Sequence, residues 1–214
     1  VMALARRHTF QVLTKRSARM RQYLHELVRA RRRWEHIIRH THGHSASPPP
    51  VLPNVWLGVS VEDQRRAGER LFDLEQTPAE VRWVSAEPLI GSLDIRPWLP
   101  RLGWVVAGGE SGPAARPMHI EWVRSLRDQC AKSGVPFLFK QWGSWIIASH
   151  ENGHTDSCMA TNDAVWLDID ARQAKPSCNG MSEPIGMFRV PKTRAGRLLD
   201  GVEHDAYPEV RHVR

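Results

Sequence analysis

The chain has 214 residues, of which 41% are hydrophobic, so it is long enough to bury a core within one large domain. No apolar run approaches the ~20 residues of a membrane-spanning helix, and residues 1–10 lack the pattern of a signal peptide. Three scattered cysteines without C-x-x-C spacing favour a reducing compartment and form no recognisable metal motif. We therefore expect a soluble cytoplasmic protein with no membrane partner and no metal ligand in this sequence.

The positive charge of the chain is concentrated near one end. Residues 1–40 carry 11 Lys/Arg and 2 Asp/Glu, a balance of +9, whereas residues 41–214 carry 19 and 21, a balance of −2. The sequence pI of about 9.9 thus reflects one basic arm rather than a basic protein. Such a distribution weakens any inference from the pI alone to a nucleic-acid ligand.

Apolar runs alternate with amphipathic stretches along the first two thirds of the chain. Predicted strands are 9–16, 54–63, 81–91, 102–111 and 135–143. Predicted helices are 17–40, with Ser17 as N-cap, then 64–76 and 119–134. This alternation predicts an α/β fold, a partial (β/α) barrel of about five parallel strands over residues 1–145, with a His/Ser/Pro-rich linker at 41–53.

The remaining residues, 146–214, break this alternation and are rich in loop-forming residues. We expect strands at 164–169 and 186–190 and a short helix over 194–201. The sequence therefore predicts a small α+β C-terminal appendage that packs on the barrel.

Polar side chains follow each of the five predicted strands. They are Lys15 and Arg16; Ser60 and Glu62; Glu87; Glu110 and Ser111; and Lys140, Gln141 and Trp142. Ligands of parallel α/β folds bind at the carboxyl ends of the strands, so we expect these residues to converge on one polar site. The alternative interpretation is that strand ends are polar only because they adjoin loops.

The fourth predicted strand runs into a Gly-Gly-Glu-Ser-Gly turn at 108–112. Glycines allow close backbone approach, so successive N–H groups can hold an anion, while Glu110 can bind an amine or ribose hydroxyls. The turn does not match the G-x-G-x-x-G pattern of dinucleotide-binding folds. Taken alone, it also fits a tight loop without a ligand.

The basic helix offers an alternative function. Arg31, Arg32 and Arg33 could contact the phosphates of a nucleic acid, although a helix face of this kind is more often simply solvated. His40, His42 and His44 lie in the linker without a Cys or carboxylate partner, and Cys130 lies on the apolar stripe of its helix, as expected of a buried thiol. The sequence contains no motif of a nucleophilic triad, P-loop or zinc protease.

Several segments together resemble a known family. They are HTFQVLTKR, NVWLGVSVED, RWVSAEPLIG, WVVAGGESGPAARPMHIEWVRSLRDQC, GVPFLFKQWGSW and AGRLLDG. In this order, over about residues 1–207, the chain resembles the phage-associated bacterial "gp thirty-seven / gp sixty-eight" family of unknown function. The resemblance implies a radical-SAM-like barrel with an N-terminal three-cysteine motif, and for the full-length family a [4Fe-4S] cluster and S-adenosylmethionine.

The cysteine motif of that family lies upstream of the strand matching TFQVLTKR, so no residue of this chain corresponds to a cluster ligand. We therefore expect a chain truncated at its N-terminus that does not by itself cleave S-adenosylmethionine reductively. We also expect self-association through the exposed edge of strand 9–16, because an edge strand leaves its N–H and C=O groups unpaired. An inactive gene remnant is a third interpretation of the sequence.

Site roles follow from the resemblance and from the strand ends together. The cofactor contacts are Gly108, Gly109, Glu110 and Ser111. The residues facing the substrate as candidate catalytic groups are Lys15, Glu62, Glu87 and Lys140. Further contacts with a substrate or nucleic acid are Arg16, Arg31, Arg32, Arg33, Arg116, Gln141 and Trp142. The expected ligand is anionic or of the nucleoside type.

Overall fold

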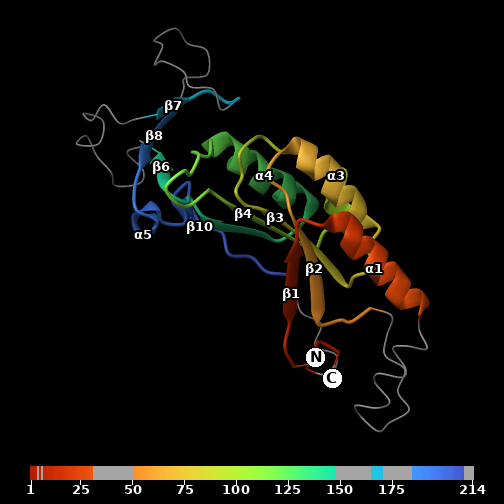
Figure 1. The fold of residues 1–214 in the computed structure, drawn as a ribbon. Coiled ribbons are helices and arrows are strands. Elements are labelled where there is room, and N and C mark those ends of the chain that lie inside the picture. The colour runs from red at the N-terminus through yellow and green to blue at the C-terminus, as the bar shows by residue number, and fades with distance from the viewer. Residues whose placement is uncertain (4, 6, 31–50, 148–164, 171–184, 210–214) are drawn as a thin grey trace.

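The computed structural model of the chain describes residues 1–3, 5, 7–30, 51–147, 165–170 and 185–209 (Figure 1). Its largest element is a five-stranded sheet whose spatial order follows the sequence. The strands are β1 (Phe10–Thr14), β2 (Val55–Ser60), β3 (Val81–Ala86), β4 (Trp104–Gly108) and β5 (Phe137–Gln141). All four neighbouring pairs are parallel, with a register irregularity after Ala107 in β4.

Three helices cover one face of this sheet: α1 (Ser17–Arg29), α3 (Gln64–Glu75) and α4 (Ile120–Ser133) (Figure 1). The connection between β3 and β4 holds only the short 3-10 turn η1 (Leu99–Arg101), because its prolines interrupt the segment. Sequential strand order with helices on a single face is the winding of a β/α barrel, whereas doubly wound folds place helices on both faces. The predicted α/β fold class is thus confirmed.

Alternating side chains of the strands supply two separate apolar clusters. Leu57 and Val59 of β2 point to the helices and belong to the large core beneath α3 and α4. The opposite face carries a smaller cluster of Trp56, Trp83, Trp104, Val106 and Leu138. Both faces of the central strands are therefore buried, which explains their nearly continuous apolar sequences.

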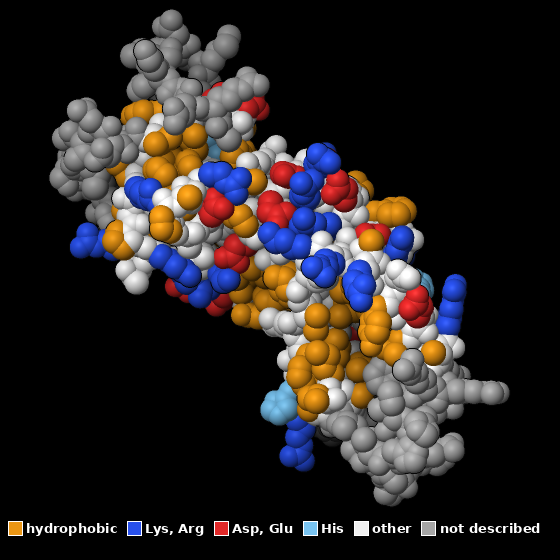
Figure 2. All heavy atoms as spheres, in the orientation of Figure 1, with side chains coloured by type: hydrophobic (Ala, Val, Ile, Leu, Met, Phe, Trp, Pro, Cys, Tyr) orange, Lys and Arg blue, Asp and Glu red, His pale blue; other side chains and the backbone are white. Residues whose placement is uncertain are grey.

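The sheet ends differently on its two sides. The outer side of β5 meets the C-terminal segment, where the Phe139 N–H donates to the His204 carbonyl at 2.8 Å. No strand in the described ranges pairs with the outer side of β1, and Leu13 of that strand is 45% exposed. Hydrophobic side chains gather around β1 and β2, whereas charged side chains of both signs intermingle over the helical layer (Figure 2).

The C-terminal region forms two small antiparallel sheets. One has the order β6-β8-β7, from β6 (Trp145–Ile147), β7 (Val165–Leu167) and β8 (Ile185–Arg189). The other is a hairpin of β9 (Leu198–Leu199) and β10 (Val202–Glu203), preceded by the short helix α5 (Lys192–Ala195). The loop-rich α+β character of this region agrees with the sequence prediction, whereas β6 was not predicted.

Two local predictions were wrong. The helix predicted over 194–201 is present only at its start, because α5 ends at Ala195, and the rest of the segment enters the β9–β10 hairpin, whose turn residues Asp200 and Gly201 both adopt positive φ (54° and 73°). Ser17 is the first residue of α1 rather than its N-cap, and its hydroxyl donates to Asp73 Oδ2 at 2.7 Å.

The linker residues 41–50 and the helix residues 31–40 lie outside the described residues. Among those described, no helix is long and apolar enough to cross a membrane.

The Trp83 indole packs directly over Gly58. A Cβ atom added at Gly58 would lie 2.3 Å from an indole carbon, so Gly58→Ala forces the ring or the backbone to move. We expect this substitution to lower the free energy of unfolding by about 1–3 kcal/mol, as overpacking generally does.

The matched control is Gly68→Ala on the exposed side of α3, where nothing lies within 4 Å of the added Cβ. This control should raise stability by about 0.5–1 kcal/mol. Urea unfolding of both variants measures the difference, and equal effects would contradict the prediction.

Candidate functional site

The carboxyl edge of the five-stranded sheet carries a group of interacting polar side chains. This carboxyl-edge cluster consists of Lys15, Glu62, Arg70, Glu87, Glu110, Arg116, Lys140 and Gln141. Parallel strands bring their carboxyl ends to the same edge, so the residues that follow β1, β2, β3 and β4 and the last two residues of β5 lie together there. The cluster includes all four residues predicted to face the substrate.

Glu62, after β2, is held between two cations. Lys15 Nζ lies 2.6 Å from Glu62 Oε1, and Arg70 Nη1 of α3 lies 2.8 Å from Glu62 Oε2. Arg70 also donates to the Ser60 carbonyl at 2.7 Å, which fixes the guanidinium against the end of β2. Burial raises the pKa of Glu62, but the Lys15 hydrogen bond and the charges of Arg70 and Lys15 outweigh it and lower the pKa. Glu62 is therefore an ionised acceptor at neutral pH.

Glu87, after β3, joins β3 to β5. Its two carboxylate oxygens accept from Lys140 Nζ and from Gln141 Nε2, both at 2.9 Å. The absence of a side chain at Gly108 makes room for this carboxylate, since a Cβ there would lie 3.2 Å from Glu87 Cδ. Gln141 also reaches Ser111 Oγ at 3.5 Å, so this group extends to the glycine-rich turn.

Glu110, in the turn after β4, is bound by Arg116 in a two-pronged geometry. Arg116 Nε donates to Oε2 at 2.8 Å and Nη2 donates to Oε1 at 2.9 Å. The Arg116 backbone N–H donates to Oε2 as well, at 2.9 Å. The hydrogen bond from Arg116 is the largest cause of a lowered pKa at Glu110, and the charges of Arg116 and Lys15 lower it further.

Charges of the cluster also act on one another across the sheet. The charge of Lys15, which follows β1, lowers the pKa of Glu110 after β4, and the charge of Glu62 raises the pKa of Arg116.

The carboxylates of the cluster are shielded while several of its cations are accessible. The Glu62, Glu87 and Glu110 side chains are 11%, 19% and 24% exposed, whereas their partners Lys15, Lys140 and Arg116 are 60%, 54% and 56% exposed. Each carboxylate thus positions a cation whose outer side faces solvent. The outer sides of these cations are therefore open to an anion from solvent.

The glycine-rich turn is fixed against the chain after β5. A Cβ at Gly109 would lie 2.0 Å from the Trp142 carbonyl oxygen, and one at Gly143 (φ 85°) would lie 2.1 Å from the Glu110 oxygen. These two glycines therefore allow the close approach of the two loops. The Gly109 N–H donates to the Gln141 carbonyl and the Ser144 N–H donates to the Glu110 carbonyl, both at 2.9 Å.

Other predicted site residues lie elsewhere. Trp142 is only 3% exposed, and its indole donates to the Leu198 carbonyl at 2.8 Å, so its side chain belongs to the core. Arg16 follows Lys15 at the exposed edge, and Arg31, Arg32 and Arg33 lie outside the described residues. The nucleic-acid interpretation of the basic helix stays a prediction.

Cys130 is fully buried on α4, and burial raises the pKa of its thiol to about 12, as expected of a structural cysteine. Cys158 and Cys178 lie outside the described residues. Over the described ranges no group of three His, Cys, Asp or Glu could hold a metal ion. These residues therefore do not fit the thiolate ligand set of a [4Fe-4S] cluster.

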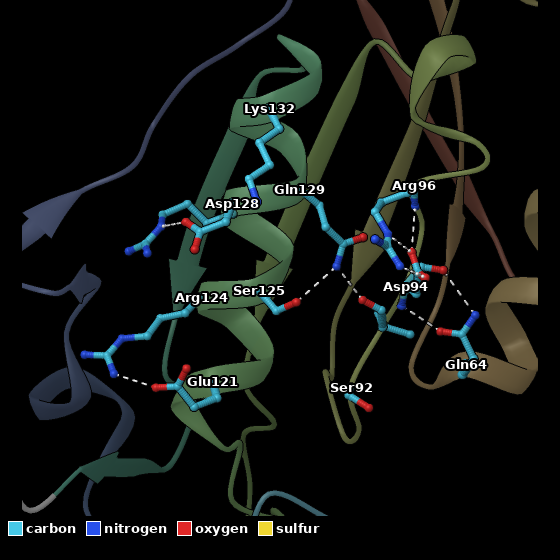
Figure 3. A pocket seen from close by; sticks show the side chains of 12 residues that line it. Gln64, Ser92, Asp94, Arg96, Glu121, Arg124, Ser125, Asp128, Gln129 and Lys132 are labelled. Carbon is cyan, nitrogen blue, oxygen red and sulfur yellow. Dashed lines mark hydrogen bonds and ion pairs between the residues drawn. The ribbon is translucent and has the colours of Figure 1, made fainter.

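A groove of about 810 Å³ lies apart from the cluster, between α4 and the loop after β3 (Figure 3). Its charged residues neutralise one another. Arg96 pairs with Asp94 at 2.6 Å, and Arg124 pairs with Glu121 at 2.6 Å. Asp200 binds both Arg124 and Arg127, which ties the β9–β10 turn to α4. The groove is a network of internal ion pairs rather than a site with surplus charge.

Arg70 is the member of the site that the sequence did not indicate. It lies within the amphipathic pattern of α3, where an arginine is usually a solvated surface residue, yet its side chain is only 14% exposed. Its position eight residues after Glu62 gives no periodic signal, because the two lie in different elements. The contact with Glu62 arises from the packing of α3 on β2.

The five-stranded parallel sheet with helices on one face is that of an α/β protein of the β/α-barrel type, and charged side chains gather at its strand ends. The chain belongs to the family described as "Protein of unknown function (DUF5131)", whose model matches residues 1–208. No curated protein and no solved structure matches the chain. Membership of an uncharacterised family is thus confirmed, whereas phage association and a radical-SAM relationship stay predictions.

The Glu110–Arg116 pair predicts a pH-dependent stability. The pKa of Glu110 is lower in the folded than in the unfolded chain, so the pair stabilises the fold fully above the unfolded value, near 4.5. This stabilisation is lost as the pH falls through the lowered folded value. Because Arg116 is half-exposed, we expect at most about 1 kcal/mol at neutral pH.

Urea unfolding of the wild type and of Glu110→Gln, between about pH 7 and about pH 3, measures this contribution. The difference between the two proteins should be constant near neutrality and shrink below about pH 4.5. Glu69→Gln, on the exposed side of α3, is the control for removing a surface carboxylate. A Glu110→Gln effect that does not change with pH would contradict the assignment.

Proposed function

We propose that the carboxyl-edge cluster binds an anionic, nucleoside-type small molecule, and that the protein descends from radical-SAM-like barrel enzymes. One observation carries the ligand proposal: the three shielded carboxylates, which follow β2, β3 and β4, each orient an exposed cation at one edge of the sheet. Purely structural ion pairs do not require the cations to remain open to solvent. The resemblance of the segments from HTFQVLTKR to AGRLLDG supports the descent.

The chemistry of the cluster suits a ligand with both polar hydroxyls and negative charge. The oxygens of Glu87 and Glu110 keep lone pairs that can accept from ribose hydroxyls or an amine, in addition to their bonds with Lys140 and Arg116. Lys15 and Lys140 present ammonium groups to the anionic part. Ser111, within reach of Gln141, adds a hydroxyl beside the turn.

Glu62 serves this site as a fixed charge. Two cations hold its carboxylate in the ionised form, so it accepts hydrogen bonds at neutral pH and does not supply a proton. Its role in the proposed site is to position Lys15, while Arg70 compensates its second oxygen.

The proposal predicts that Glu87 contributes to binding of the sugar or amine. Adenosine, which tests the nucleoside part alone, and S-adenosylmethionine, which adds a carboxylate as the anionic group, are titrated separately into the full chain by calorimetry. We expect at least one to bind and Glu87→Gln to weaken it about tenfold, because one charge-assisted hydrogen bond is worth ≈ 1.5–3 kcal/mol. Glu69→Gln removes an exposed carboxylate of α3 and should leave the affinity unchanged.

The competing outcomes are distinct. Failure of both compounds to bind, or equal affinities of Glu87→Gln and Glu69→Gln, would overturn the proposed site. Because Glu87 contacts Lys140 and Gln141, thermal unfolding of each variant is measured first. A variant that unfolds at the wild-type temperature gives an affinity that reports binding alone.

A further inference from the structure

The sheet face opposite the helices carries two neighbouring serines, Ser60 of β2 and Ser85 of β3, at the carboxyl ends of their strands. They are partners in the parallel register, so this serine pair lies side by side. Val59 and Val84, the residues before them, belong to the helical core, so the serines point to the opposite face. We infer that the serine pair binds the edge of a nucleobase that carries its exocyclic amine or carbonyl. The inference rests on the proposed function and adds the base to its ligand.

The hydroxyls of the serine pair are buried without a protein partner. Ser60 and Ser85 are only 5% and 4% exposed, and neither hydroxyl makes a hydrogen bond to a described residue. The two other buried serines of the described ranges are satisfied within the protein. Ser17 donates to Asp73 Oδ2 at 2.7 Å, and Ser144 Oγ accepts from an N–H of the glycine-rich turn at 3.0 Å. Because buried hydroxyls are normally hydrogen-bonded, the unpaired serines indicate a ligand group at this place.

An aromatic ring lies below the serine pair on the same face. Gly58 and Trp83, the preceding register pair on this face, are covered by the Trp83 indole, whose Nε1 would lie 2.5 Å from a Cβ at Gly58. The indole N–H is itself buried without an acceptor among the described residues. A ligand therefore reaches the serine hydroxyls from the carboxyl edge. An ion would lose its hydration against the ring, so a neutral polar group is favoured there.

The carboxylates above the serine pair are held apart. Glu62 and Glu87 follow the serines on the same two strands. Glu62 is bound by Lys15, after β1, and by Arg70 of α3, whereas Glu87 is bound by two residues of β5. In the described part of the chain no side-chain contact joins the two carboxylates across the serine pair. A base can thus lie between β2 and β3 while its ribose hydroxyls reach Glu87.

The chemistry of two adjacent hydroxyls matches a nucleobase edge. A serine hydroxyl both donates and accepts, whereas the ionised carboxylates beside it only accept. Neighbouring strands lie ≈ 4.8 Å apart, so each hydroxyl can make its own hydrogen bond to one of two adjacent atoms of a planar group. The exocyclic edge of a nucleobase presents such adjacent donors and acceptors without a net charge. The serine pair therefore fits the base, and the exposed Lys15 and Lys140 fit the anionic part of the ligand.

The experiment titrates adenosine, inosine and purine riboside into the full chain by calorimetry. All three carry the same ribose, but purine riboside lacks the exocyclic group of the base. We expect adenosine or inosine to bind about tenfold more tightly than purine riboside, because the missing group leaves a buried hydroxyl unpaired. In the Ser60→Ala/Ser85→Ala variant this difference should disappear, because no hydroxyl remains to be paired.

Stability measurements separate a binding role from a structural one. The double variant removes hydroxyls without a protein partner, so its thermal unfolding temperature should equal or exceed that of the wild type. The matched control is Ser17→Ala, which removes a buried hydroxyl bonded to Asp73. This control should lower the unfolding temperature and leave the nucleoside affinities unchanged. A double variant destabilised as much as Ser17→Ala would overturn the inference.

The binding outcomes are equally distinct. Equal affinities of the wild type for all three compounds, or no binding of any of them, overturn the inference. An unchanged preference for the exocyclic group in the double variant overturns it as well. If adenosine binding depends on Glu87 but not on the serine pair, the proposed function holds and the base inference fails.

Discussion

The parallel pairing of five consecutive strands determines where the helices, the core and the polar strand ends lie. Pairing in chain order requires each connection to return along the same face, so α1, α3 and α4 all cover one side of the sheet. It also directs every strand end to one edge. The apolar side chains then divide between the helical core and the tryptophan cluster of the opposite face. The carboxyl edge collects the polar residues at the strand ends, which is why residues far apart in the sequence, such as Lys15 and Lys140, belong to one cluster.

The carboxylates at this edge are stabilised by ion pairs, and the most shielded of them has the most cationic partners. Transfer of a carboxylate out of water is costly, and the shielded Glu62 offsets this cost with two cations rather than one. Glu110 gains a two-pronged arginine and a backbone N–H. The exposed cations have little desolvation cost of their own, since their outer sides stay hydrated. The ion pairs of the α4 groove differ, because the carboxylates of Asp94, Glu121 and Asp128 there are 49%, 45% and 54% exposed.

The fold and the composition of the site were largely predictable from the sequence, because both depend on local patterns. Apolar runs that end in Lys15, Glu62, Glu87 and Glu110 mark the strands and their polar ends at once. Interactions between elements leave no such pattern in the sequence. Arg70 has the spacing of a surface residue of α3, yet it donates to the end of β2. The Trp142 indole is buried because its N–H finds an acceptor in the Leu198 carbonyl of β9. The 194–201 segment was misjudged because its leucines fit a helix, whereas the Asp200-Gly201 turn determines a hairpin. Tertiary contacts thus override local propensity where the segments are short.

Rigid and adaptable groups are separated within the site, and this separation follows from backbone packing. Gly109 and Gly143 bring the turn after β4 against the chain after β5 at distances that no other residue permits. The Glu110 carbonyl is fixed there by the Ser144 N–H, so the carboxylate on the same residue starts from a fixed backbone. Lys15 and Arg116 instead extend from this frame with most of their length in solvent. A binding site gains from that combination, because fixed acceptors reduce the conformational entropy lost on association while long cationic side chains adjust to the ligand.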